Sequence, residues 1–275
     1  MRLHRTPRIA LAAAFALGAI ACGPSPRAGG DVDAGPGSAD GGGGPPAGAA
    51  AVYAHSSDTL YSVDPVSLDV TAVGPFGWAG LTDQMTDIAI DGDGRMLGVT
   101  GAGAVVEIDP TTAAVTRLSA GLPSPFNGLS FVPPSQLGQA GGPDVLVASR
   151  NADGAIFRVD PVTGAVSQVG NMGGFQSSGD LVSVDGFGTV ATVVGAGDDR
   201  LVNLAPGSFA GAVVGTDIGY DDLWGVAFWG GTIYGFAQGG QFIAIDPVTG
   251  VGTLIASSSV SWWGAAVTTR APVID

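Results

Sequence analysis

One short phrase recurs along the chain and constrains the fold more than any other feature. It begins with an Asp-Pro pair at Asp64, Asp109, Asp160 and Asp246, and an Ala-Pro pair at Ala205 marks a worn fifth copy. Successive copies start 45, 51, 45 and 41 residues apart. Repeats of roughly this length, made of short strands, are typical of propeller blades. The chain is therefore predicted to be all-β and to form a five-bladed β-propeller.

Each copy of the phrase is predicted to be a hairpin with a tight turn. The four clear copies read LYSVDPVSLDV, VVEIDPTTAAV, IFRVDPVTGAV and FIAIDPVTGVG. Pro presets φ for the turn, Asp accepts hydrogen bonds from turn amides, and a later position takes a left-handed conformation that favours glycine. Gly164 and Gly250 fit this position. Leu68 and Ala113 replace glycine there, so these two turns are expected to be strained or differently shaped.

The innermost strand of each blade is predicted from its place in the repeat. The C-terminal one has no strands after it, and the first hairpin, which opens at Ala51–His55, has no innermost strand before it. We therefore expect the C-terminal strand to complete the first blade and close the ring, which removes two exposed edges. The predicted innermost strands are Asp87–Asp91, Gly128–Val132, Asp180–Val184, Leu223–Trp229 and Trp262–Thr268.

Two phrases resemble known bacterial propellers. The segment MTDIAIDGDGRMLGVT, residues 85–100, resembles the NHL and YVTN type of repeat, and the DPxTG hairpins are similar to those of uncharacterised propeller lipoproteins. The resemblance covers the whole domain predicted for residues 50–275. It implies a four-stranded antiparallel blade, and it implies no particular activity because propellers include binding modules, scaffolds and enzymes.

The first 22 residues are predicted to be a lipoprotein signal peptide. Arg2, Arg5 and Arg8 form a positive n-region, and the apolar stretch from Ile9 to Ile20 is too short to span a bilayer. The ending LGAIAC resembles the bacterial lipobox, which implies lipidation of Cys22. The alternative is that Cys22 is an incidental apolar residue of the h-region. It is the only cysteine, so no disulfide is expected.

Residues 23–49 are predicted to be a disordered tether between the lipid anchor and the propeller. This segment is rich in Gly, Pro and Asp and has little apolar surface to bury. Gly23 follows the cysteine where some bacteria place an Asp for inner-membrane retention. We therefore expect an exported lipoprotein of the cell envelope, anchored to the outer membrane.

Charge limits the partners of the predicted mature chain. After loss of the three signal-peptide arginines it keeps seven Arg and no Lys against 24 acidic residues, of which Glu107 is the only Glu. Such a surface repels nucleic acid and anionic headgroups. The expected partners are the membrane, through the lipid anchor, and a glycan or a protein, and the domain is expected to be a monomer.

The expected ligand face is formed by the loops that lead from each outermost strand to the next innermost strand. Aromatic planes beside Asp and Asn side chains suit a sugar or a peptide. The alternative is that these rings wedge between blades and belong to the core. The candidate ligand-binding residues are Trp78, Asp87, Asn127, Asp180, Tyr220, Asp222, Trp224, Trp262 and Trp263.

A polar ring is expected at the mouth of the central channel. Asp87, Asn127 and Asp180 begin successive innermost strands, so they could hold a cation or ordered water. A Ca²⁺ ion at Asp87 and Asp180 is the only cofactor that the sequence suggests. Capping of the strand ends is the alternative role for the same side chains.

Catalytic patterns are mostly missing, so no catalytic residue is assigned. His55 is the only histidine after the signal peptide, which excludes a site with several His ligands, and no G-x-S-x-G phrase occurs. The favoured function is a binding module on an aromatic and acidic face. The alternative is a hydrolase or lyase that acts on a polysaccharide or a lactone through paired Asp residues. A purely structural spacer is the third hypothesis.

Overall fold

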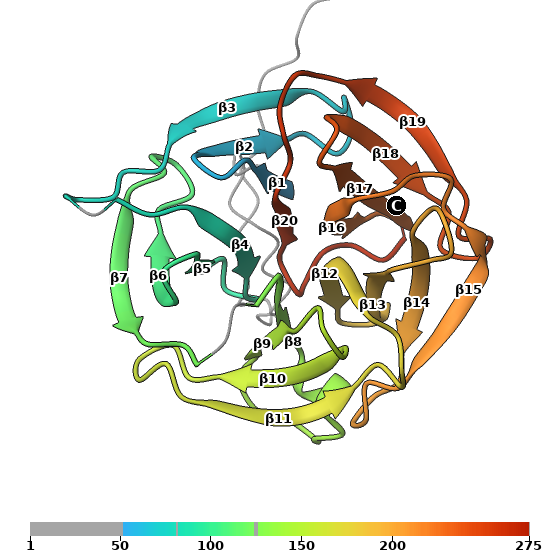
Figure 1. Cartoon of the computed structure of the whole chain (residues 1–275), viewed down its shortest axis with the longest axis horizontal. Helices are drawn as coiled ribbons and strands as arrows, with labels where there is room; N and C mark the ends of the chain where they lie inside the picture. Colours follow the sequence, from blue (N-terminus) through green and yellow to red (C-terminus); the bar gives the residue numbers. More distant parts are fainter. Residues whose placement is uncertain (1–51, 81, 124–125, 275) are drawn as a thin grey trace, which may run out of the picture. The chain divides into compact units, whose positions relative to one another are not determined.

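The computed structural model describes residues 52–80, 82–123 and 126–274. These residues form five four-stranded antiparallel sheets arranged around an axis (Figure 1). The predicted signal peptide with Cys22 and the predicted tether lie outside the described residues. Within the described part, no helix is long and apolar enough to cross a membrane.

Each blade is one sheet, and its strands run in order from the axis to the rim. The first contains β20 (Gly264–Val267), β1 (Val52–His55), β2 (Thr59–Val63) and β3 (Val70–Pro75). The second contains β4 (Met85–Ile90), β5 (Met96–Thr100), β6 (Ala104–Ile108) and β7 (Val115–Ala120). The third contains β8 (Gly128–Val132), β9 (Val145–Ser149), β10 (Ala155–Val159) and β11 (Val166–Asn171), with the short 3₁₀ helix η1 (Pro134–Leu137) after β8. The fourth contains β12 (Ser177–Val184), β13 (Gly188–Val193), β14 (Arg200–Leu204) and β15 (Gly211–Asp217). The fifth contains β16 (Leu223–Trp229), β17 (Thr232–Ala237), β18 (Gln241–Ile245) and β19 (Gly252–Ser257).

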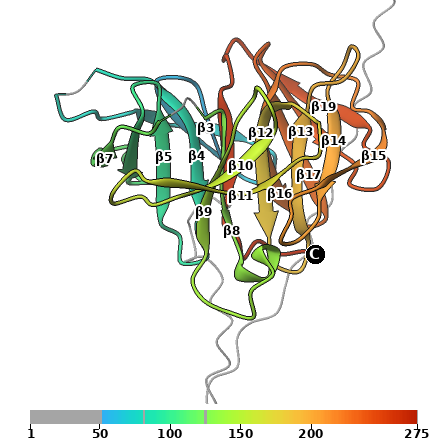
Figure 2. The same cartoon turned by 60° about the horizontal axis from the view of Figure 1, so that its bottom comes forward.

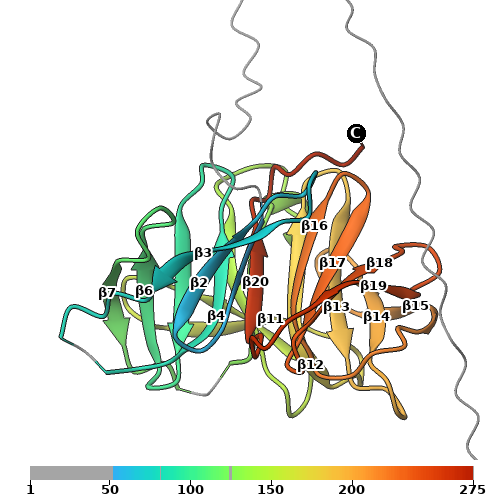
Figure 3. The ribbon, with the colours of Figure 1, turned by 90° about the horizontal axis from the view of Figure 1, so that it is seen from above.

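The ring closes as the sequence predicts. β20 pairs antiparallel with β1, with Val52 opposite Val267 and His55 opposite Gly264. Figure 3 shows β20 beside the N-terminal hairpin, although the two segments come from opposite ends of the propeller sequence. This pairing gives the edge of β1 a partner, so the first blade has four strands like the other blades.

The recurrent turns take the conformation that their sequence requires. Leu68 and Ala113 have φ values of 64° and 57°, in the left-handed region, where Gly164 has 72°. In the worn copy Phe209 takes the same position with φ 57°. At each Asp-Pro turn the Asp carboxylate accepts two backbone N–H bonds, as Asp160 does from residues 162 and 163. These bonds hold the turn even where a non-glycine residue must be left-handed.

Burial decreases from the axis outwards. All five residues of β5 and of β9 are buried, whereas the outermost strands β3 and β19 have no buried residue. A strand that is covered on both faces has a nearly continuous run of apolar residues, whereas the outer strands also contain exposed Thr, Ser and Gln. The apolar packing therefore lies between neighbouring blades, and the side view in Figure 2 shows their strands packed side by side.

Glycines allow the innermost strands to approach one another. Gly225 of β16 has no room for a side chain, because a Cβ there would lie 2.6 Å from the carbonyl carbon of Gly264 in β20. Gly128 of β8 is in a similar position: its Cβ would lie 2.4 Å from Ser149 Oγ of its own blade and 2.7 Å from the carbonyl oxygen of Gly179 in the next blade. In both cases one obstacle is the backbone of the next blade, which cannot move without shifting that blade.

We predict that Gly225→Ala lowers the free energy of unfolding by about 1–3 kcal/mol, the usual cost of overpacking a tight core. Gly197→Ala is the matched control, because nothing lies within 4 Å of its Cβ position, and its effect should stay within about 0.5 kcal/mol. Urea unfolding of both variants measures the difference. Equal stability of the two would show that the blades do not meet this closely at Gly225.

Candidate functional site

Five innermost strands each place one residue at the same level of the axis. Two of these residues are aspartates, whose carboxylates accept the backbone N–H groups of their own and neighbouring strands. Asp87 accepts from Ile88 at 2.8 Å and from Leu129 of the third blade at 2.6 Å. Asp180 accepts from Leu181 at 2.6 Å and from Val226 of the fifth blade at 2.9 Å. Each axial residue comes directly before one of these N–H donors or, in β20, before Ala265, whose N–H also interacts with Asp180. The five axial residues are Asp87, Gly128, Asp180, Gly225 and Gly264.

The two axial carboxyl groups are fully buried and interact electrostatically with each other. Burial raises the pKa of Asp87 well above its ordinary value, and the charge of Asp180 raises it further. Burial also raises the pKa of Asp180 to about 8, against the opposing effect of its hydrogen bonds. Because burial raises the pKa of both groups, to about 8 for Asp180, the pair holds at least one proton at neutral pH.

His55 at the end of β1 completes this buried cluster. Its Nδ1 donates to the carbonyl oxygen of Ser56 at 2.8 Å, and its Nε2 lies 3.7 Å from Asp87 Oδ1 without a hydrogen-bond partner. The distance alone would suit an ion pair, but complete burial lowers the pKa of His55 to about 4. The imidazole is therefore neutral at neutral pH. Gly264 makes room for this approach, because a side chain there would collide with both Asp87 and His55.

The structure places Gly128, rather than Asn127, at the axial level. Asn127 comes one residue earlier, is half-buried, and its Nδ2 donates to Ser177 Oγ at 3.4 Å. A shift of one residue turns a side chain to the other face of a strand. The polar ring therefore contains Asp87 and Asp180 with His55, and Asn127 lies beside it.

The predicted Ca²⁺ at Asp87 and Asp180 stays a prediction. Their four carboxyl oxygens already accept backbone hydrogen bonds. In residues 52–274, apart from the gaps named above, no group of three or more His, Cys, Asp or Glu side chains is arranged to hold a metal ion. In the structure the carboxylates bond N–H groups at the starts of strands in different blades. This is the alternative role, capping of strand ends, that the sequence analysis kept open.

The aromatic candidates divide into buried core rings and half-buried rings. Trp262 is 1% exposed and packs edge-on against Tyr61 at 5.0 Å and Phe236 at 5.4 Å. Phe76 and Phe126 of the corresponding loops are also buried. These three residues wedge between blades, so they belong to the core. The aromatic candidates that stay half-buried are Trp78, Tyr220, Trp224 and Trp263.

The structure brings two of the half-buried rings together. Trp224 and Trp263 directly precede the axial residues Gly225 and Gly264, and their ring centroids lie 5.9 Å apart with an interplanar angle of 84°. The backbone N–H of Trp263 donates to the carbonyl oxygen of His55 at 2.8 Å. Trp78 instead packs on Phe76 between the first two blades, at 5.8 Å, and Tyr220 lies against the fifth blade near Gly252.

Carboxylates lie close to this tryptophan pair in the sequence. Asp221 and Asp222 are exposed, and Asp222 has a left-handed φ of 53° just before β16. Asp199, which is buried, accepts hydrogen bonds from the Ser178 hydroxyl and from the Leu223 N–H. Burial raises the pKa of Asp199 to about 6, and the charges of Asp221 and Asp222 add to this rise. Asp199 therefore interacts electrostatically with both exposed carboxylates.

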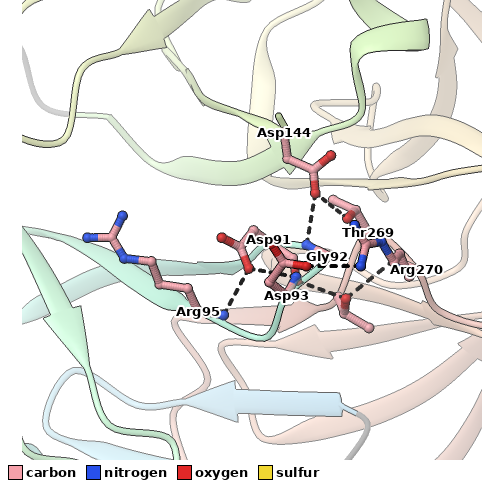
Figure 4. Close-up of polar contacts among 8 residues, drawn as sticks. Asp91, Gly92, Asp93, Arg95, Asp144, Thr269 and Arg270 are labelled. Carbon is pink, nitrogen blue, oxygen red and sulfur yellow. Dashed lines mark hydrogen bonds and ion pairs between the residues drawn. The ribbon is translucent and has the colours of Figure 1, made fainter. Parts of the chain in front are cut away.

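The C-terminal segment after β20 covers the other end of the axis. Thr269 bonds Asp144 of the third blade at 2.5 Å, and the same carboxylate accepts the N–H of Gly92 at 2.8 Å (Figure 4). Arg270 pairs with Asp93 at 3.0 Å. The segment also reaches the fourth and fifth blades, through bonds from the N–H groups of residues 185 and 230 at 2.8 and 2.9 Å. Sequence reasoning missed this contact set, because nothing in the repeat indicates the path of residues 268–274.

The comparisons with known proteins support the fold. No family model matches the chain, and no curated protein matches it. Among solved structures 472 chains match. One comes from a crystal structure of a nidogen/laminin complex, with a TM-score of 0.51 and 9% sequence identity over 80% of this chain and 98% of that chain. At this identity the likeness shows a propeller fold and nothing about activity.

We predict that stability falls as the pH rises from about 6.5 to about 8.5. A carboxyl whose pKa is higher in the folded protein contributes stability that is complete below its unfolded pKa and is lost as the pH rises through its folded pKa. Asp87 and Asp180 are such groups. His55 has the opposite slope, but only between about pH 4 and 6.5, and Asp199 titrates near pH 6.

Urea unfolding across this pH range measures the effect. The profile of Asp180→Asn should be flatter than that of the parent protein, and Asp185→Asn, at an exposed position near the other end of the axis, should leave the slope unchanged. A parent profile that is flat or rises above pH 6.5 would contradict a protonated axial pair.

Proposed function

We propose that the protein is an exported, membrane-anchored binding module whose propeller captures a glycan or a peptide. The observation that carries this proposal is the half-buried pair of Trp224 and Trp263, whose rings contact each other near the mouth of the axis. Two large rings at one loop cluster offer apolar area that a sugar face or a peptide side chain can cover. Exposed Asp221 and Asp222 add acceptors for hydroxyl or amide protons.

The end of the axis that carries the tryptophan pair suits this role. The opposite end is occupied by the C-terminal segment, whose Thr269 and Arg270 are bonded to neighbouring blades. Propellers of the same fold occur in protein complexes, as in the nidogen/laminin structure. The proposal keeps the expectation of a monomer with no nucleic-acid partner, which is supported by the excess of acidic side chains.

A hydrolase or lyase with paired aspartates receives less support from the geometry. The two aspartates that meet at the axis are fully buried, and their four carboxyl oxygens accept backbone N–H bonds. Glycosidase carboxyls are about 5–10 Å apart, so that the substrate and water fit between them. Two carboxyl groups that are fully buried and bonded to the innermost strands leave a substrate no access to both.

We predict that Trp224→Ala or Trp263→Ala weakens ligand binding at least tenfold, about 1.4 kcal/mol. Glycan and peptide arrays would find the ligand, and titration calorimetry would compare the variants. Trp229→Ala is the matched control, because Trp229 is also half-buried but lies at the other end of β16. Equal loss in all three variants would assign the effect to stability rather than to the binding face.

The anchor is tested separately. We predict that cells incorporate a labelled fatty acid into the protein and that Cys22→Ser removes the label. The protein should then leave the membrane fraction, because one or more acyl chains supply the attachment. Unchanged labelling of the variant would contradict the anchor at Cys22 and leave the binding role of the propeller to be judged from the tryptophan variants.

A further inference from the structure

The tryptophan pair forms a corner rather than a flat platform. The rings of Trp224 and Trp263 meet at 84° with centroids 5.9 Å apart, so two walls stand almost at right angles. The face of an indole ring carries partial negative charge, and Trp is the side chain that attracts cations most strongly through its face. A flat sugar ring is covered best by a parallel ring, whereas a compact cation can contact both walls of a corner.

The two carboxylates that come just before Trp224 in the sequence have no cationic partner among the described residues. Asp221 and Asp222 are exposed, and the ion pairs of the described part of the chain involve other acids. Burial raises the pKa of Asp199, and the charges of Asp221 and Asp222 add to that rise. Two exposed carboxylates without a cationic partner make the surface locally negative.

The arginines at the same end of the axis do not compensate this charge. Arg150 follows β9 and pairs with Asp153 at 2.5 Å, while it also covers the ring of Phe157 at 4.9 Å. Arg200 begins β14 and pairs with Asp217 at 2.5 Å. Each arginine is therefore neutralised by its own aspartate. The charge left over at the loop face is negative.

We propose that the group bound at Trp224 and Trp263 is a cation, an ammonium or quaternary ammonium group of the ligand. This inference rests on the proposed function and names the chemistry of the same site. The corner supplies two aromatic faces, and Asp221 and Asp222 supply the charge that draws the cation and disfavours anionic ligands. An amino sugar, a lysine side chain and a choline headgroup all carry this chemistry.

The test compares a cation with its neutral isostere. Choline and 3,3-dimethylbutan-1-ol have the same shape, and only choline is charged. We expect the detergent-purified full chain to bind choline at least tenfold more tightly in titration calorimetry, and to lose affinity when salt rises from about 50 to about 500 mM. Trp224→Ala should abolish the preference, because it removes one wall of the corner.

A second set of variants and ligands separates charge from shape and one source from another. The double variant Asp221→Asn with Asp222→Asn should reduce both choline affinity and its salt dependence, while Asp185→Asn, near the other end of the axis, should change neither. Glucosamine, Nα-acetyl-lysine amide and choline, compared directly, identify the source of the cation by their relative affinities.

The outcomes of the two proposals differ. Equal binding of the neutral isostere, or choline affinity that survives both Trp224→Ala and the double Asp variant, would overturn the cation proposal. Neutral glycans or peptides that bind through the tryptophans, with no affinity for choline or the two amines, would overturn it too while the binding function stands. Tryptophan variants without effect on any ligand would overturn both.

Discussion

The fold depends on how the backbone N–H groups around the axis find acceptors. Five innermost strands converge there, and three of the five axial positions are glycine, which lets the backbones approach without side chains between them. Buried N–H groups in this crowded space require acceptors. Asp87 and Asp180 supply them, and each joins its own blade to another. Burial raises the pKa of both, and the retained proton keeps two carboxyl groups together without two adjacent charges.

The same convergence positions the surface site. Because Gly225 and Gly264 lie at the axial level, the residues before them come to the mouth of the axis from neighbouring blades, and both are tryptophan. Gly179 in the fourth blade has no side chain there, since a Cβ would lie 2.5 Å from the Cα of Trp224. The C-terminal segment covers the other end, bonded to Asp144. The two ends of the axis are thus different in chemistry, although the blades repeat.

Much of this fold could be predicted from the sequence, because the turns repeat and their chemistry is local. The closure of the first blade follows from counting strands, and the left-handed Leu68 and Ala113 follow from the turn pattern. The site was harder to predict, since it depends on which face of a strand a residue occupies. Trp263 is half-buried, whereas Trp262, one residue earlier, is buried in the core. Asn127 likewise lies one residue before the axial position of Gly128. Neither the burial of His55 against Asp87 nor the path of the C-terminal segment leaves a signal in the repeat.

Aspartate serves three purposes in this chain, and its surroundings decide which. In the turns, as at Asp160, backbone N–H bonds lower the pKa, so the carboxylate is charged and one of its oxygens holds the turn. At the axis, burial raises the pKa of Asp87, and the group acts as a partly protonated connector between strands. Asp221 and Asp222 are exposed, and their carboxylates make no hydrogen bond or ion pair with the described residues. Asp87 and Asp180 use both carboxyl oxygens within the fold, whereas Asp221 and Asp222, just before Trp224, can accept hydrogen bonds from a ligand without losing one to the fold. The proposed binding through Asp221 and Asp222 would therefore break none of the hydrogen bonds that join the blades at the axis.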